Sequence, residues 1–139
     1  MASKAYRCTF EVRGYEIDAF GHVNNANYLN YYEHARWTML AEEKIDLNSF
    51  KSWDRWPVIA GIDVQYLKPI FMGDTITIES RIIEYRRSSM QIEQKIFKGQ
   101  AEISTAKIRS VFVDGRGKPA ALPDDVEAKW KSITAGENP

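Results

Sequence analysis

The chain has 139 residues, of which 44% are hydrophobic and 12% aromatic, and this content predicts a single globular domain, residues 1–139, with a buried core. Nineteen basic residues balance nineteen acidic ones, so no chain-wide positive field favours nucleic acid or an anionic membrane as a partner. Cys8 is the only cysteine, which excludes a disulfide within the chain and a cysteine-based metal cluster, and we expect it to be a small buried hydrophobe.

The first third of the sequence predicts a strand, a connection and a long helix. Apolar and polar side chains alternate over residues 6–12, which is the period of a half-buried β-strand. Residues 14–24 are typical of an irregular connection, in which Gly21 supplies backbone freedom. Over residues 26–44 apolar side chains recur every three or four positions, which predicts one amphipathic helix of about five turns.

The middle of the chain predicts a loop and then strands. Residues 46–57 mix turn-forming residues with large rings, so we expect an ordered loop held by Phe50, Trp53 and Trp56. Alternating side chains then predict three strands in succession, which we expect to pair as an antiparallel meander. These strands cover residues 58–66, 75–85 and 90–96.

The last third predicts a strand and a short helix. Residues 102–113 predict the strand, in which a shift of the apolar phase indicates a bulge near Ala106. The helix is expected over residues 124–133, where Asp124 and Glu127 are spaced as a capping box. The whole order predicts an α+β domain with an antiparallel sheet of about five strands wrapped around one long central helix.

Asp18 is the first candidate for chemistry, because this lone carboxylate stands just ahead of the long helix. Asn24 or Asn25 is expected to cap that helix, and the free N–H groups at its start favour a developing oxyanion. The plain alternative is that Asp18 is a turn residue that accepts hydrogen bonds from its own backbone. For His22, a structural hydrogen bond near the helix start competes with a supporting role in a site.

The run of residues 15–36 resembles the signature of hotdog-fold acyl-CoA thioesterases of the 4-hydroxybenzoyl-CoA thioesterase type. It reads Tyr-Glu-Ile-Asp-Ala-Phe-Gly-His-Val-Asn-Asn-Ala-Asn-Tyr-Leu-Asn-Tyr-Tyr-Glu-His-Ala-Arg. It is also similar to the motif of plant acyl-carrier-protein thioesterases, which have Asn two residues after the Asp where this chain has Phe20. The element order continues the resemblance over residues 6–122.

The resemblance implies a hotdog fold with Asp18 as the catalytic carboxylate, acting either as a general base or as a nucleophile. It implies that a backbone N–H near Asn25 polarises the thioester carbonyl and that His22 orients groups in the site. Burial of Asp18 among residues such as Tyr15 and Phe20 would favour the base route. The resemblance further implies a homodimer or homotetramer, with the active site built across a dimer interface.

Two more groups of side chains are candidates for binding an acyl-CoA substrate. Tyr28 and other rings could line an acyl pocket, although core packing is their commoner role; the others are Tyr31, Tyr32, Trp37, Trp53 and Trp56. Residues 85–90 are similar to the family segment that runs near bound coenzyme A, although surface turn charges are the commoner reading. The side chains in question there are Arg86, Arg87, Ser88 and Ser89.

We therefore expect an acyl-CoA thioester hydrolase that needs no metal or redox cofactor. His34 fits no metal-ligand spacing with His22, Asp18 or Cys8. The alternatives are a hotdog-fold hydratase or dehydratase acting on acyl thioesters, and a non-catalytic acyl-CoA-binding module, because fold alone does not fix activity. The N-terminal residues lack the apolar core of a signal peptide and no apolar run is long enough to span a bilayer, so the cytoplasm is the expected location.

Overall fold

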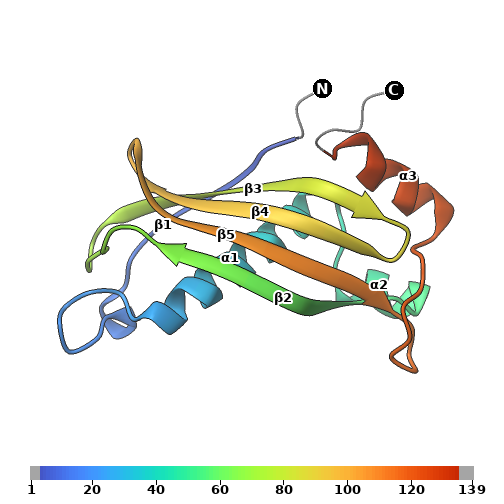
Figure 1. Cartoon of the computed structure of the whole chain (residues 1–139), viewed down its shortest axis with the longest axis horizontal. Helices are drawn as coiled ribbons and strands as arrows, with labels where there is room; N and C mark the ends of the chain where they lie inside the picture. Colours follow the sequence, from blue (N-terminus) through green and yellow to red (C-terminus); the bar gives the residue numbers. More distant parts are fainter. Residues whose placement is uncertain (1–3, 135–139) are drawn as a thin grey trace.

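The computed structural model describes residues 4–134, in which one sheet of five antiparallel strands curls around a long helix (Figure 1). The spatial order of the strands is β1-β3-β4-β5-β2. Their bounds are β1 (Tyr6–Glu11), β2 (Trp56–Tyr66), β3 (Thr75–Arg86), β4 (Ser89–Lys98) and β5 (Ala101–Val113). The predicted α+β class is confirmed, with the long helix after the first strand and a short helix at the C-terminal end.

The pairing of β2 differs from the predicted meander. Strands β3, β4 and β5 form a meander, but β2 pairs with β5 at the far edge and makes no ladder with β3. Alternation of apolar and polar side chains predicts that a segment is a strand, but it does not predict which other strand it pairs with. β2 is the strand at one edge of the sheet, and β3 lies next to β1 at the other edge. The chain between β2 and β3 therefore crosses the sheet.

Helix α1 (Asn25–Glu42) begins at Asn24, whose side-chain oxygen accepts a hydrogen bond from the Ala26 N–H at 2.9 Å. This confirms the predicted cap. The helix buries one stripe of side chains against the sheet, namely Tyr28, Tyr31, Tyr32, Ala35 and Met39. The facing side chains of the sheet are buried at every second position of β3 and β4, for example at Ile78 and Ile92, so one face of the sheet and one stripe of the helix make the core.

A second helix, α2 (Leu47–Trp53), replaces the loop predicted over residues 46–57. Asp46 caps it: the carboxylate accepts from the Ser49 N–H at 3.0 Å, and the Ser49 hydroxyl accepts from the Asp46 N–H at 3.1 Å. The spacing of Asp46 and Ser49 is that of a capping box, and it is the local pattern in the sequence that indicates this helix start. Phe50 is buried from this helix, as expected of an aromatic anchor.

Two smaller predictions were wrong. The bulge in β5 lies at Ile103 and not near Ala106, because Ile96 of β4 pairs with Ser104 while the next residue, Phe97, pairs with Glu102. After that bulge, every second side chain of β5 is buried without interruption. Two of these buried residues are serines, so the apolar pattern in the sequence changes phase where the strand itself does not. The short helix α3 (Asp124–Ser132) starts after Pro123 without any side-chain cap, so Asp124 and Glu127 form no capping box.

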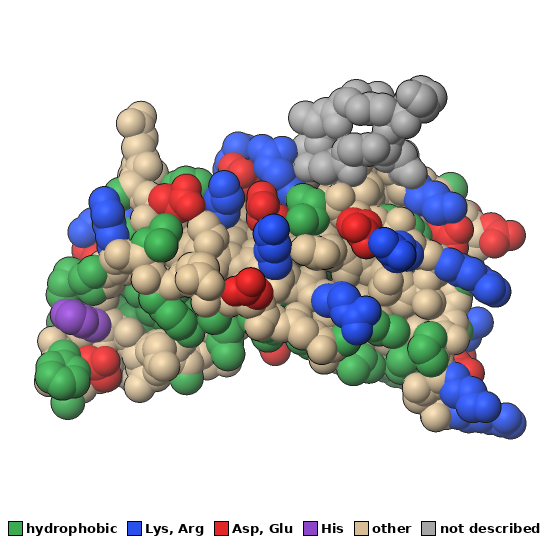
Figure 2. Space-filling model, viewed as in Figure 1, with side chains coloured by type: hydrophobic (Ala, Val, Ile, Leu, Met, Phe, Trp, Pro, Cys, Tyr) green, Lys and Arg blue, Asp and Glu red, His purple; other side chains and the backbone are tan. Residues whose placement is uncertain are grey.

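Strand β2 keeps apolar side chains exposed although they lie on the helix side of the sheet. Ile62 pairs with Ile108 and Ile59 pairs with Ser110, and both partners are buried on the face toward α1. Nevertheless Ile59, Ile62 and Tyr66 are 41–46% exposed, because α1 does not cover this edge. Figure 2 shows hydrophobic side chains along this border of the molecule. Among the described helices, none combines the length and the apolar character that crossing a bilayer requires.

Candidate active site

Asp18 lies in a tight turn between β1 and α1. Its carboxylate oxygen Oδ1 accepts hydrogen bonds from the Phe20 N–H at 2.9 Å and the His22 N–H at 3.2 Å. The turn is closed by the Gly21 N–H, which donates to the Asp18 carbonyl at 3.0 Å, and Gly21 adopts a φ of 80°, which favours glycine. The interpretation of Asp18 as a turn residue is therefore correct for its oxygen Oδ1. Its other oxygen, Oδ2, accepts no hydrogen bond from residues 4–134.

The helix start lies beside this turn. The Asn24 N–H donates to the Glu16 carbonyl and the Asn24 side chain caps Ala26, which fixes the first turn of α1. The Asn25 N–H has no acceptor among the described residues, so it is one of the free donors that a helix N-terminus presents. Its partial positive charge favours an anionic oxygen.

An open hollow of about 320 Å³ brings these groups together. Asp18, His22, Asn25 and Tyr28 all line it, so four predicted site residues meet in one place. The opposite wall comes from the end of β2 and the loop after it, and was not expected from the sequence; it consists of Tyr66, Leu67, Lys68 and Pro69. The Tyr66 hydroxyl donates to the Asn25 carbonyl at 3.1 Å, which joins this wall to the helix start.

The His22 side chain is exposed and makes no hydrogen bond with the described residues. Its ring packs edge-on against Phe71, with ring centroids 5.1 Å apart. The expected structural bond to the helix start is therefore absent within residues 4–134, and the ring is free to contact a ligand in the hollow. His34, by contrast, packs against Phe10 on the other side of α1.

Glu16 anchors the Asp18 turn and was not among the predicted site residues. This buried carboxylate accepts from the Tyr31 hydroxyl at 2.8 Å and from the Arg13 N–H at 2.8 Å. Burial and the hydrogen bond to Glu16 raise the pKa of Tyr31, so the phenol stays a protonated donor. The Glu16 carbonyl also accepts from the Asn27 side chain, so the turn and the first turn of α1 are held as one unit.

The rings expected to enclose Asp18 do not do so within this chain. Tyr15 is 83% exposed and Phe20 is 86% exposed. Two large rings held in water beside a candidate site are unusual, because burying each would be favourable by about 2 kcal/mol. They mark this end of the molecule as a surface that something else can cover.

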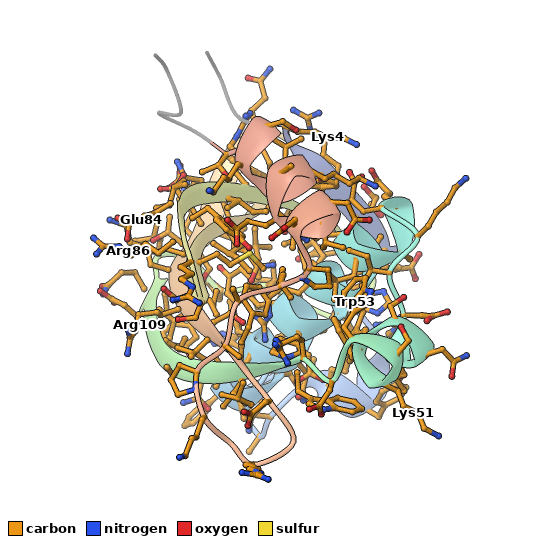
Figure 3. All side chains as sticks on the ribbon, turned by 90° about the vertical axis from the view of Figure 1, so that its right-hand side faces the viewer. Lys4, Lys51, Trp53, Glu84, Arg86 and Arg109 are labelled. Carbon is orange, nitrogen blue, oxygen red and sulfur yellow. The ribbon has the colours of Figure 1, made fainter. Side chains whose placement is uncertain are left out.

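The basic turn between β3 and β4 lies at the opposite end of the molecule from Asp18 (Figure 1). Figure 3 shows Glu84, Arg86 and Arg109 extending from that end of the sheet into solvent. Arg86 forms an ion pair with Glu84 at 2.7 Å. The length of β3, roughly 35 Å, separates Arg86 from the hollow, so one chain does not bring Arg86, Arg87, Ser88 and Ser89 to Asp18.

Comparison with known proteins identifies the family. A family model described as the thioesterase-like superfamily matches residues 12–130, which include the Asp18 turn, α1 and the whole sheet after it. The chain belongs to the thioesterase-like superfamily. The predicted recognition and enzyme class, a hotdog-fold thioester hydrolase, are thereby confirmed.

Relatives within the thioesterase-like superfamily agree with this. The long-chain acyl-CoA thioesterase FadM of Escherichia coli K12 is 32% identical over 127 residues, which are 88% of this chain and 95% of FadM. The chloroplastic acyl-acyl carrier protein thioesterase ATL2 of Arabidopsis thaliana is 32% identical over 120 residues, or 85% of this chain; the match spans 64% of ATL2. A probable thioesterase from Bartonella henselae shares the fold, with a TM-score of 0.82 at 23% identity over 86% of this chain and all of that one.

Proposed function

We propose that this chain hydrolyses acyl-CoA thioesters to a carboxylic acid and free coenzyme A, with Asp18 and the start of α1 as the reacting site. The observation that carries the proposal is that a carboxylate oxygen without a partner and a helix N-terminal N–H line one hollow. Coenzyme A is favoured as the carrier because FadM is matched over nearly its full length, whereas ATL2 is matched over 64% of it.

The chemistry follows from the two groups. The Asn25 N–H binds the thioester carbonyl oxygen and stabilises its negative charge as the carbonyl carbon becomes tetrahedral. In the general-base route, Asp18 takes a proton from a water whose oxygen bonds to that carbon; the C–S bond then breaks and the thiolate takes up the proton. In the nucleophilic route, Asp18 itself attacks, coenzyme A leaves, and water opens the mixed anhydride.

The test is release of free thiol from a panel of acyl-CoA thioesters of different chain lengths. We expect turnover with at least one member of the panel. Binding of acyl-CoA without thiol release would favour a non-catalytic module, and hydration of a 2-enoyl-CoA without thiol release would favour a hydratase. Either result would overturn the proposal.

His22 is proposed to support the reaction without carrying it. Replacing His22 with alanine is expected to lower kcat about tenfold, because the ring lines the hollow but makes no hydrogen bond that holds the turn. Steady-state kinetics checks this, with His34→Ala as the matched control, since His34 lies outside the hollow. Native turnover in His22→Ala would reduce His22 to a packing residue.

A homodimer through the β2 edge is the proposed assembly. Within residues 4–134 the outer edge of β2 pairs with no other strand, and the strand carries exposed apolar side chains. Pairing of two β2 strands about a two-fold axis runs them antiparallel, so the Arg86 end of one copy turns toward the Asp18 end of the other. Such a dimer accounts for a basic turn that lies far from Asp18 in its own chain, and a tetramer would be built from two of these dimers.

Ile62→Lys tests the dimer. A charge at this exposed β2 position is expected to convert the protein to monomers and to lower turnover with it. Analytical ultracentrifugation measures the first effect and thiol release the second. Thr9→Lys on the opposite edge strand is the control and should change neither. A fully active monomeric native protein would contradict the shared site. The cytoplasmic location stays a prediction.

A further inference from the structure

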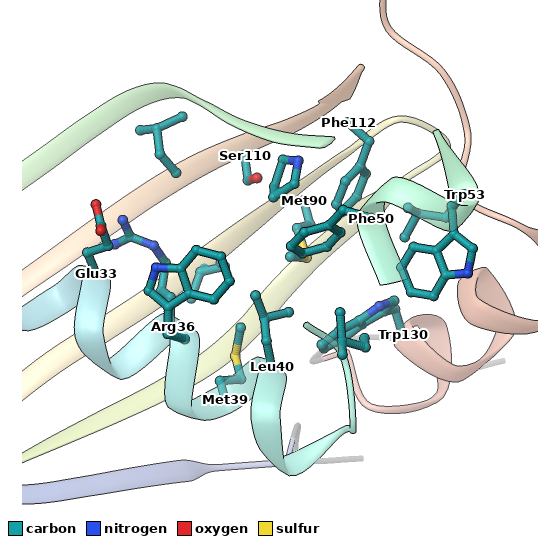
Figure 4. A pocket seen from close by; sticks show the side chains of 16 residues that line it. Glu33, Arg36, Met39, Leu40, Phe50, Trp53, Met90, Ser110, Phe112 and Trp130 are labelled. Carbon is teal, nitrogen blue, oxygen red and sulfur yellow. The ribbon is translucent and has the colours of Figure 1, made fainter. Parts of the chain in front are cut away.

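A second hollow lies at the other end of α1 and takes no part in the site described above. It is a cavity of about 190 Å³ between the second half of α1, α2, α3 and the strands β2, β4 and β5. We call it the aromatic cavity. Its walls include Trp37, Leu40, Phe50, Trp53, Phe112 and Trp130 (Figure 4).

Charged side chains line the aromatic cavity at one end only. Figure 4 shows Glu33 and Arg36 at the end nearer the start of α1, and Phe50, Trp53 and Phe112 at the other. The Arg36 guanidinium donates to the Gln94 side chain at 3.1 Å, so its charge is held against the wall. The end of the cavity toward α2 and α3 is therefore the part that suits the apolar end of a ligand.

The two hollows share the same two walls. Asn25 of α1 and Tyr66 of β2 line the first, whereas Glu33 of α1 and Ile59 of β2 line the aromatic cavity. Leu29, one helical turn beyond Asn25, is exposed and apolar, and so is Ile62 between Tyr66 and Ile59. One exposed apolar side chain on each wall, Leu29 and Ile62, therefore lies between the helix start and the end of the cavity that Glu33 and Arg36 line.

The dimensions select the kind of ligand. From Asn25 to Leu40 the helix rises roughly 22 Å, so only a long chain reaches from one hollow to the other. A cavity of roughly 150 Å³ already holds a benzene ring, whereas pockets for an entire small molecule measure about 300–1,000 Å³. The aromatic cavity is thus sized for part of a ligand, such as the end of an alkyl chain.

We propose that the aromatic cavity binds the apolar end of a long-chain acyl group whose thioester lies at the start of α1. This rests on the proposed hydrolase function and assigns its substrate class. The deep end offers rings that are shielded from solvent, because Trp130 is 2% exposed and Phe50 is 3% exposed. Trp37, which is 40% exposed, stands where the cavity opens.

The first test is binding and does not depend on catalysis. A hexadecanoic acid that carries bromine at its far end quenches tryptophan fluorescence on contact, and three of the four tryptophans line the cavity. We expect saturable quenching in both the native protein and Asp18→Asn. Ser110→Leu fills the cavity from β5 and should weaken this binding about tenfold, whereas Thr105→Leu, at a half-buried position that does not line the cavity, should not.

The second test is chain-length preference. Ser110→Leu is expected to lower kcat/KM for hexadecanoyl-CoA about tenfold and to leave butanoyl-CoA unchanged. If Ser110→Leu does not fold, Leu40→Phe narrows the same cavity from α1. Absence of quenching, or equal effects on both substrates, overturns the proposal. Quenching without hydrolysis of any thioester would instead contradict the proposed hydrolase function, and the cavity would then be a binding site for fatty acids.

Discussion

Replacing Asp18 with asparagine is expected to lower thioester hydrolysis at least about 1,000-fold, which corresponds to about 4 kcal/mol in the activation barrier. Asparagine keeps an oxygen that can accept from the Phe20 and His22 N–H groups, so the turn should hold its shape. What it loses is the carboxylate charge, and with it both the base and the nucleophile. Thiol release from the best acyl-CoA of the panel measures the effect.

The matched variant Asp18→Ala separates chemistry from structure. Alanine removes the acceptor of two backbone hydrogen bonds as well as the charge, so we expect it to be inactive and also to melt at a lower temperature. Asp18→Asn should melt close to the native protein and keep its affinity for coenzyme A. Native turnover by a well-folded Asp18→Asn would contradict the assignment of Asp18.

Replacing Glu43 with glutamine is expected to cost about 2 kcal/mol of the free energy of unfolding at neutral pH. The buried carboxylate joins three elements: Oε2 accepts from Lys4 at 2.8 Å and from the Tyr6 hydroxyl at 2.6 Å, and Oε1 pairs with Lys129 at 3.0 Å. Burial alone would raise the pKa of Glu43, but the hydrogen bonds from Lys4, Tyr6 and Lys129 outweigh it and lower the pKa to about 2.

The sign of the pH dependence follows from that shift. The pKa of Glu43 is lower in the folded chain than its ordinary value of 4.5, so the unfolded chain binds the proton more tightly. The stabilisation is therefore complete above pH 4.5 and is lost as the pH falls toward 2. Urea unfolding at several pH values should show native and Glu43→Gln converging at low pH. Glu42→Gln, on the exposed side of α1, is the control and should match the native protein throughout.

The elements of this fold could be predicted where one period dominates. The helix α1 and the strands β3 and β4 bury side chains at regular spacing, and their predicted limits lie within two residues of the observed ones. Helix α2 was missed because seven residues are too few to show a helical period. The place of β2 beside β5 was not predicted, because it depends on contacts between residues that are 38 (Tyr66 and Ser104) to 57 (Trp56 and Val113) positions apart in the sequence.

Distance along the sequence also decides which residues of the candidate site could be predicted. Asp18, His22 and Asn25 lie within eight residues of one another, so a single turn and helix start bring them together. The opposite wall of the hollow lies at Tyr66 and Lys68, which no local pattern connects to Asp18. Glu16 could have been noticed, because it stands three residues after Arg13 and accepts its N–H, but a glutamate beside a turn usually reads as a solvated charge.

The two edges of the sheet have opposite properties, and this limits how large an assembly can grow. β2 is eleven residues long and exposes several apolar side chains to water. β1 is six residues long, and its exposed side chains are Arg7, Thr9 and Glu11. In the proposed dimer, the β2 edges of the two copies pair with each other, so neither copy keeps a free β2 edge. Every further addition would have to start from β1, whose shortness and charge discourage another strand. With the proposed β2 dimer, sheet extension would therefore stop at a closed particle and would not continue into an open-ended fibre.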